Sequence, residues 1–232
     1  MSAGLCTETD NNGVADMKTL SDWNTTEHEV AKLMEENSSL RGIVLGYVAE
    51  EKLKKIIESN SEVSSNYKPH DQDKSIRCDR VVVYKQQQFY IEVKSILSNT
   101  IRSELDYFVG TAKTNYADKK ELLFDDGSKC VTSLAMRKEF DILAVNCYHM
   151  TGKWDFVFIP NQSIPATESS EYTQFQKSQL LTRTIDVCFP PKNPLHSTNL
   201  IFLMDEILGG RIAGRMKIQH NTKSPSLLDY MT

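Results

Sequence analysis

The sequence predicts an α/β fold in which helices flank a central mixed β-sheet. Runs of β-branched and aromatic residues recur at 77–96, 139–148 and 153–159, and each is bounded by turn-forming residues. Segments with apolar residues at three- and four-residue steps precede and follow these runs, as amphipathic helices require. The chain has 232 residues, enough to bury a full core. We expect helices on both faces of the sheet.

The two ends of the chain differ in composition from its centre. Residues 1–20 are rich in Ser, Thr, Asn, Asp and Gly and carry few large apolar groups, so a flexible N-terminal arm is expected there. Residues 21–232 are then expected to form a single domain with a C-terminal embellishment. Residues 59–75 are polar and contain Pro69, which favours a loop leading into the first long apolar run.

Helix signals stand at both sides of the central runs. Thr26 and Glu29 have the spacing of a capping box, which predicts a helix to about Glu36. Towards the C-terminus, the pattern predicts a short helix at 172–181, a strand at 185–189 and a helix at 199–208.

A second helix is expected from about Gly42 to Ser59. Its apolar stripe of Ile43, Tyr47, Leu53 and Ile57 is interrupted by Glu50. A carboxylate on the inner face of a helix either forms a salt bridge, for example to Lys54 one turn on, or reaches a functional site. Both interpretations stay open at this point.

The stretch 77–96 has the pattern of an antiparallel hairpin. Two apolar, β-rich runs flank a polar turn at 85–88. With Tyr84 opposite Phe89, the register places Val81 opposite Glu92 and Asp79 opposite Lys94. Opposed residues share a face and side chains alternate with period two. Asp79, Glu92 and Lys94 are therefore expected on one side of the hairpin.

Two carboxylates and an amine within apolar strands need a physical explanation, because burying unpaired charge is costly. A divalent cation supplies one, since Mg²⁺ binds one or two carboxylates together with water and phosphate oxygens. A lysine beside it can orient or deprotonate an attacking water, which is chemistry suited to phosphodiester cleavage. The alternative is an exposed Glu–Lys pair that solvates an edge strand.

Asp79 followed by Glu92-Val93-Lys94 resembles the signature of the PD-(D/E)xK nuclease superfamily, which includes type II restriction endonucleases. Cys78 stands where that family often has proline. The resemblance extends from about Arg41 to Pro165 and includes the helical segment that ends at Glu50, together with the strands at 139–148 and 153–159. It implies a restriction-endonuclease-like core.

The resemblance implies an Mg²⁺-dependent DNA endonuclease of restriction type that hydrolyses double-stranded DNA to 5′-phosphate and 3′-hydroxyl ends. It places the metal at Asp79 and Glu92, with the Val93 carbonyl as a further ligand, and has Glu50 assist the metal or its water. Lys94 would activate the water and offset charge in the transition state. Enzymes of this kind that cut both strands are commonly homodimers, and a homodimer is expected here.

Candidate DNA contacts lie after the hairpin and near the C-terminus. Basic, amide and aromatic residues interleave there, as contacts to DNA backbone or bases require. An amphipathic helix covering the sheet is the alternative for residues 98–120, where Ile101, Leu105 and Phe108 lie at helical steps and Gly110 indicates a break. The candidates are Lys113, Asn115, Tyr116, Lys119, Lys120, Arg211, Arg215 and Lys217.

Composition restricts the remaining possibilities. The net charge of -4 does not favour a nucleic-acid binder by itself. The five cysteines show no C-x-x-C spacing, which argues against a zinc site or a disulfide framework. No apolar run is long enough for a membrane span, so a cytoplasmic protein without membrane contact is expected. Asp141 and Asp155 are expected to pair structurally with Arg or Lys.

Two other functions fit the same pattern. One is a repair or junction-resolving nuclease on the same fold. The other is a catalytically silent module that binds DNA or a protein. The acidic balance favours the silent module slightly, whereas the complete set of Asp79, Glu92 and Lys94 favours a nuclease.

Overall fold

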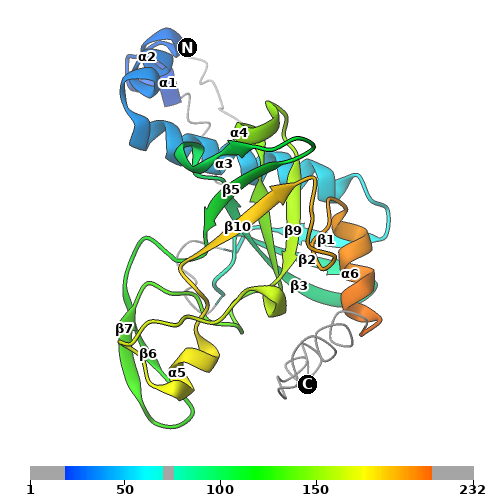
Figure 1. Cartoon of the computed structure of the whole chain (residues 1–232). Helices are drawn as coiled ribbons and strands as arrows, with labels where there is room; N and C mark the ends of the chain where they lie inside the picture. The colour runs from blue at the N-terminus through cyan, green and yellow to red at the C-terminus, as the bar shows by residue number, and fades with distance from the viewer. Residues whose placement is uncertain (1–18, 70–75, 211–232) are drawn as a thin grey trace, which may run out of the picture. The chain divides into compact units, whose positions relative to one another are not determined.

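The computed structural model describes residues 19–69 and 76–210 (Figure 1). It confirms an α/β fold with a central mixed sheet flanked by helices. The chain divides within one helix, α3 (Ser38–Glu58), into two compact units, the first ending at Val44 and the second beginning at Leu45. The predicted N-terminal arm lies almost entirely outside the described residues.

The first unit contains α1 (Thr19–Asp22), α2 (Glu27–Glu36) and the start of α3. The predicted capping box is confirmed. The Thr26 side chain accepts the backbone N–H of Glu29 at 3.2 Å, and the Thr26 N–H donates to the Glu29 carboxylate at 2.8 Å. Both contacts satisfy N–H groups that a helix start leaves unpaired. The predicted start of α3 at Gly42 was late, since the helix begins at Ser38.

The second unit is built on a five-stranded sheet. Its strands β2 and β3 form the expected hairpin, and β8 and β9 are the expected central pair. The sheet is mixed because β3 and β8 run parallel while the other neighbours are antiparallel. The predicted loop at 59–75 was wrong in part, because β1 pairs with β2 at the sheet edge. The order is β1 (Val63–Tyr67), β2 (Arg80–Tyr84), β3 (Gln87–Ser95), β8 (Ile142–Asn146), β9 (Phe156–Pro160).

One face of this sheet is covered by helices. Leu53 and Ile57 of α3, with Leu203 of α6 (Leu200–Leu208), pack against the sheet residues Ile91 and Val93. Such burial of apolar surface is the main stabilising contribution to the fold. The predicted apolar stripe of α3 holds only for its C-terminal half, because Ile43 and Tyr47 are exposed.

The opposite face is covered by a second sheet, so the prediction of helices on both faces was wrong. This sheet has the order β10 (Thr184–Phe189), β5 (Phe108–Lys113), β4 (Arg102–Ser103). In Figure 1, β5 and β10 lie side by side in front of the central strands. Ala112 and Val187 pack there against Leu143 and Val145 of β8.

The helical periodicity read in residues 98–120 was also wrong. After a short 3-10 turn (Ser98–Thr100), the segment is extended. Leu105 is fully exposed, and Gly110 lies inside β5 instead of breaking a helix. A Cβ on Gly110 would lie 2.7 Å from Cγ2 of Ile96 and 2.8 Å from Cε of Met150. Glycine is therefore required by the close approach of β5 to its neighbours.

A separate hairpin projects from the second unit. Its strands, β6 (Lys120–Leu123) and β7 (Lys129–Thr132), flank the predicted turn at Asp125-Asp126-Gly127, where Gly127 has φ +78°. Helix α5 (Gln174–Gln179) packs on it through an edge-to-face contact of Phe175 with Phe124. The hairpin and α5 lie at the far end of the unit from α4 (Tyr148–Thr151) (Figure 1). A second 3-10 turn (Asn161–Ser163) follows β9. Within the described residues, no helix is long and apolar enough to cross a membrane.

Candidate active site

The β2–β3 hairpin has a tighter turn than the sequence predicted. Tyr84 pairs with Gln87, not with Phe89, and the turn consists of Lys85 and Gln86 alone. These two residues have φ values of 48° and 63°. Positive φ at both central positions matches the twist of the flanking strands, and this match favours two-residue turns over longer ones.

The register of β2 and β3 therefore differs from the prediction by two residues, which leaves the side chains of these strands on their predicted faces. The regular pairing ends with Arg80 opposite Ile91, and the Asp79 N–H donates to the same Ile91 carbonyl at 3.0 Å, so Asp79 lies directly outside the regular ladder. Beyond the end of β2, the Val93 N–H donates to Oδ2 of Asp79 at 2.7 Å. The Lys94 ammonium lies 2.6 Å from Oε1 of Glu92. Asp79, Glu92 and Lys94 are thus brought together.

Glu92 is the buried member of this group, with 3% of the residue exposed. Burial and the charge of Asp79 raise the pKa of its carboxyl to about 8, against the opposing effect of Lys94. Burial disfavours the charged form of Lys94, but the negative charges of Glu92, Asp79 and Glu50 raise its pKa overall. With both Asp79 and Glu92 ionised, the site would hold more negative charge than Lys94 neutralises.

This donor set fits a hard divalent cation. Asp79 and Glu92 offer carboxylate oxygens, and Mg²⁺ binds to one or two carboxylates while retaining several waters. The repulsion between the two carboxylates is what such a cation would relieve. In the part of the chain that the structure describes, no three His, Cys, Asp or Glu side chains form a cluster that could hold a metal. Any metal would therefore depend on two carboxylates, a carbonyl such as that of Val93, and water.

Glu50 has a different partner from the one expected. Its Oε2 accepts from the Lys68 ammonium at 2.8 Å, whereas Lys54 pairs at 3.9 Å with Glu51. Burial raises the pKa of the Glu50 carboxyl and the charge of Asp79 raises it further, although Lys68 acts in the opposite direction. Glu50 is therefore a salt-bridged residue whose charge still acts on the group around Asp79.

Tyr116 connects this group to further cations. Its half-buried ring has Lys94 at 5.4 Å, Lys120 at 5.2 Å and Arg77 at 5.8 Å from the ring centroid. Cations at such distances are attracted to the electron-rich face of an aromatic ring. Of the candidate DNA contacts, Tyr116 thus lies beside Lys94, and Lys120 contacts the same ring.

The other candidate DNA contacts are placed differently. Asn115 is half-buried and donates to the Tyr116 carbonyl at 3.1 Å, a contact that shapes its own loop. Lys113 at the end of β5 and Lys119 are exposed. Arg211, Arg215 and Lys217 lie outside the described residues.

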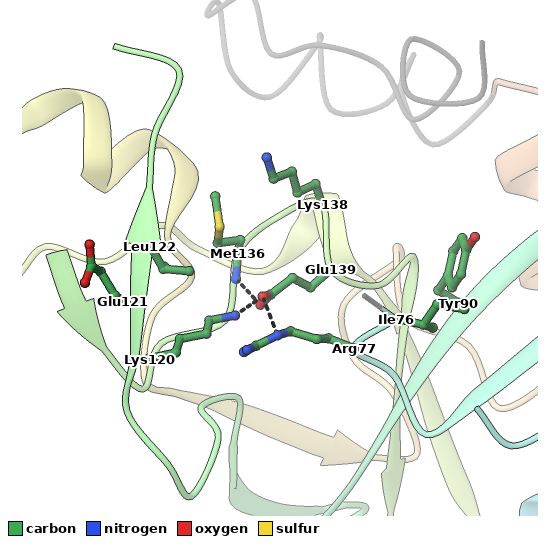
Figure 2. Close-up of a pocket in the computed structure, with 9 residues that line it drawn as sticks. All are labelled: Ile76, Arg77, Tyr90, Lys120, Glu121, Leu122, Met136, Lys138 and Glu139. Atoms are coloured by element: carbon green, nitrogen blue, oxygen red, sulfur yellow. Dashed lines mark hydrogen bonds and ion pairs between the residues drawn. The ribbon is translucent and has the colours of Figure 1, made fainter. Parts of the chain in front are cut away.

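A pocket of about 440 Å³, which no sequence pattern indicated, is lined by Arg77 and Lys120 together with seven other residues (Figure 2). At its centre, Glu139 accepts the Met136 N–H at 2.7 Å, contacts the Lys120 ammonium and lies 3.9 Å from Nε of Arg77. Figure 2 shows Lys120 and Arg77 both pointing toward Glu139. Arg77 and Glu139 are far apart in the chain, so only tertiary structure reveals that they meet. The lining residues are Ile76, Arg77, Tyr90, Lys120, Glu121, Leu122, Met136, Lys138 and Glu139.

Among the described residues, Asp141 has no cationic partner of the kind that was expected. Its Oδ2 accepts the Tyr90 N–H at 2.8 Å, and its own N–H donates to the Tyr90 carbonyl. Burial raises the pKa of the Asp141 carboxyl to about 6. The Asp141 carboxylate therefore adds a hydrogen bond to the backbone of β3 directly before the residues where β3 pairs with β8. Asp155 likewise forms no ion pair with the described residues.

Comparison with known proteins does not identify a family for this chain. No protein-family model and no curated protein matches the chain. Among solved structures, it is similar to the bacterial homing endonuclease I-Ssp6803I, with 12% sequence identity, a TM-score of 0.33, and coverage of 56% of this chain and 80% of that chain. This likeness assigns no family, and the functional argument rests on the site itself.

Proposed function

We propose that the protein is an Mg²⁺-dependent DNA endonuclease of the PD-(D/E)xK superfamily, of restriction type, which cuts duplex DNA to 5′-phosphate and 3′-hydroxyl ends. The observation that carries the proposal is the buried Glu92 placed between Asp79 and Lys94. A structural salt bridge would need one carboxylate for Lys94, whereas this site places two beside it. With both carboxyls ionised, the negative charge exceeds what Lys94 neutralises, and a bound cation would favour that ionised state.

Asp79 and Glu92 would hold the Mg²⁺, with the Val93 carbonyl as a third protein oxygen. When bound, the ion would neutralise charge on the phosphodiester and lower the pKa of a coordinated water. The Val93 N–H fixes the orientation of the Asp79 carboxylate through a 2.7 Å hydrogen bond. Preorganisation of this kind reduces the cost of assembling the site when DNA arrives.

Lys94 would orient the attacking water and offset the charge that develops on the phosphorane. Its 2.6 Å contact with Glu92 and the Tyr116 ring on another side restrict where the ammonium can lie. Glu50 would act at longer range, through its charge on Asp79 and Lys94. Its salt bridge to Lys68 fixes that charge in place.

Double-stranded DNA would be held by cations around this site. Lys113, Lys119 and Lys120 lie on the segment after the catalytic hairpin, and contacts from such residues to phosphates position a duplex without reading its sequence. A homodimer would let two copies of the site cut opposite strands.

The test is cleavage of a plasmid library of mixed sequence with Mg²⁺, followed by sequencing of the ends. We expect double-strand cuts with 5′-phosphates, and no cuts by Asp79→Ala at the same protein concentration. Ends bearing 3′-phosphates, or equal cutting by Asp79→Ala, would overturn the proposal. Duplex, nicked and branched substrates compared in parallel separate a restriction-type enzyme from a repair or junction-resolving nuclease.

A further inference from the structure

The pocket around Glu139 combines an apolar floor with a cationic wall. Ile76, Leu122 and Met136 supply apolar surface, and Tyr90 adds an aromatic ring. Small-molecule sites share this make-up, with volumes of about 300–1,000 Å³ and a few charged or polar groups that fix orientation. At about 440 Å³, the pocket is at the small end of that range.

The charges of the pocket are arranged to leave positive charge at its mouth. Glu139 is contacted by both Lys120 and Arg77, so one carboxylate serves two cations. The other lining carboxylate, Glu121, pairs at 3.0 Å with Lys129, which is not a lining residue. Lys138 adds an exposed ammonium at the rim, pointing away from Glu139 in Figure 2. The Glu139 carboxylate keeps acceptor capacity beyond its contacts with Lys120 and the Met136 N–H.

The pocket adjoins the candidate active site. The same Tyr116 ring contacts Lys94 and the pocket cations Lys120 and Arg77, at 5.2–5.8 Å from its centroid. The charge of Glu139 also acts on Glu92 and raises its pKa. A DNA strand that places a phosphate at Lys94 thus has the pocket beside its next nucleotides.

We propose that this pocket receives one unpaired nucleotide of the DNA strand next to the scissile phosphate, with its base on the apolar floor and a phosphate against Arg77 and Lys120. The inference rests on the proposed function and specifies its substrate as DNA with an extrahelical nucleotide. A base enters a protein pocket only when it leaves the stack, and the cost is least for a base that is already unpaired. Arg and aromatic groups then hold it by stacking and charge.

The experiment measures binding without cleavage, with Ca²⁺ in place of Mg²⁺. Fluorescence anisotropy compares a labelled duplex carrying one bulged nucleotide, its fully paired counterpart and the single strand. Wild type should bind the bulged duplex about 10-fold or more tightly than the paired one, the scale of one stacked base. Equal affinities for the two duplexes would overturn the proposal.

Two variants locate the effect. Leu122→Trp fills the pocket, and Lys138→Ala removes charge from the exposed rim without touching the core. Both should abolish or reduce the preference for the bulge while leaving the affinity for paired duplex nearly unchanged. The matched controls are Val131→Trp, on the exposed face of the same hairpin, and Lys153→Ala, an exposed lysine after α4; both should keep the preference.

The outcomes separate this inference from the proposed function. If both pocket variants keep the preference for the bulge, the bulged nucleotide is bound elsewhere and the inference is overturned. Mg²⁺-dependent cutting of paired duplex with no preference for the bulge would remove the pocket role and leave the nuclease standing. A preference that depends on the pocket, together with no cleavage under any metal, would support the role of the pocket and overturn the proposed nuclease activity.

Discussion

Replacing Glu92 with Gln should stabilise the metal-free protein at neutral pH. The carboxyl has its ordinary pKa of 4.5 in the unfolded chain and about 8 in the folded protein. A carboxyl with a raised folded pKa contributes stability below pH 4.5, and that contribution is lost as the pH rises from 4.5 to 8. At pH 7, a displacement of roughly 2.5 pH units costs about 3 kcal/mol at 1.36 kcal/mol per unit.

The Glu92→Gln substitution keeps the side-chain shape and an acceptor for Lys94 but removes the charge. Because Lys94 then loses an ionic partner, we expect a net gain in unfolding free energy of about 1–3 kcal/mol at pH 7, and none near pH 4. Chemical denaturation across pH 4–8 with EDTA measures it. Glu121→Gln is the control, since its 3.0 Å pair with Lys129 is exposed on both sides and surface pairs contribute little.

Added Mg²⁺ provides the second half of this test. A ligand that binds only the folded state raises its stability. Mg²⁺ should therefore stabilise wild type and have little effect on Glu92→Gln. The reasoning would be refuted if Glu92→Gln is less stable than wild type at pH 7 without metal. It would also be refuted if Mg²⁺ stabilises Glu92→Gln as much as it stabilises wild type.

Three further predictions address other groups. Glu50→Gln should preserve or raise the stability of the protein, because folding raises the pKa of this carboxyl despite its ion pair with Lys68. Cleavage by the variant should fall. A protein that is destabilised in thermal melts but fully active in single-turnover assays would contradict this prediction. Ca²⁺ should support DNA binding in gel-shift assays without cutting, since the larger ion holds oxygens but activates water poorly, and efficient cutting would count against the site. Asp141→Asn should be more stable than wild type by about 3 kcal/mol above pH 6, because the folded pKa of Asp141 is about 6 and its ordinary value is 3.8. The contribution of Asp141 to wild-type stability is lost as the pH rises between these two values. Urea denaturation at pH 4 and pH 7.5 should show the difference only at the higher pH.

Much of the candidate trio was predictable from sequence because side chains alternate with period two along a strand. The register of the hairpin was wrong by two residues, yet Glu92 and Lys94 still share a face of β3. Asp79 lies outside the regular pairing and is held beside them by its hydrogen bond from the Val93 N–H. The central strands were predictable for a related reason. Their apolar runs are long, and every residue from Ile142 to Cys147 is buried.

What failed in the prediction depended on contacts between distant segments. The short apolar steps at Ile101, Leu105 and Phe108 fit a helix as well as a strand, and the packing of β5 on the central sheet decided between them. Lys68 was missed as the partner of Glu50 because the edge strand before it looked like a loop.

The pocket around Glu139 was missed for the same reason. Arg77, Lys120 and Glu139 come from three separated segments, and none belongs to a motif. Charge composition offered no help, because the protein is acidic overall while these cations gather locally.

Single-turnover cleavage by Lys94→Ala, measured beside its DNA affinity, tests the central claim most directly. With Mg²⁺, cleavage should fall by about 10²-fold or more, as the loss of water activation and charge stabilisation implies. DNA affinity in Ca²⁺ should stay close to wild type, and Lys55→Ala, an exposed lysine of α3, should match wild type in both measurements. Near-wild-type cleavage by Lys94→Ala would contradict the assignment of Asp79, Glu92 and Lys94 as the active site.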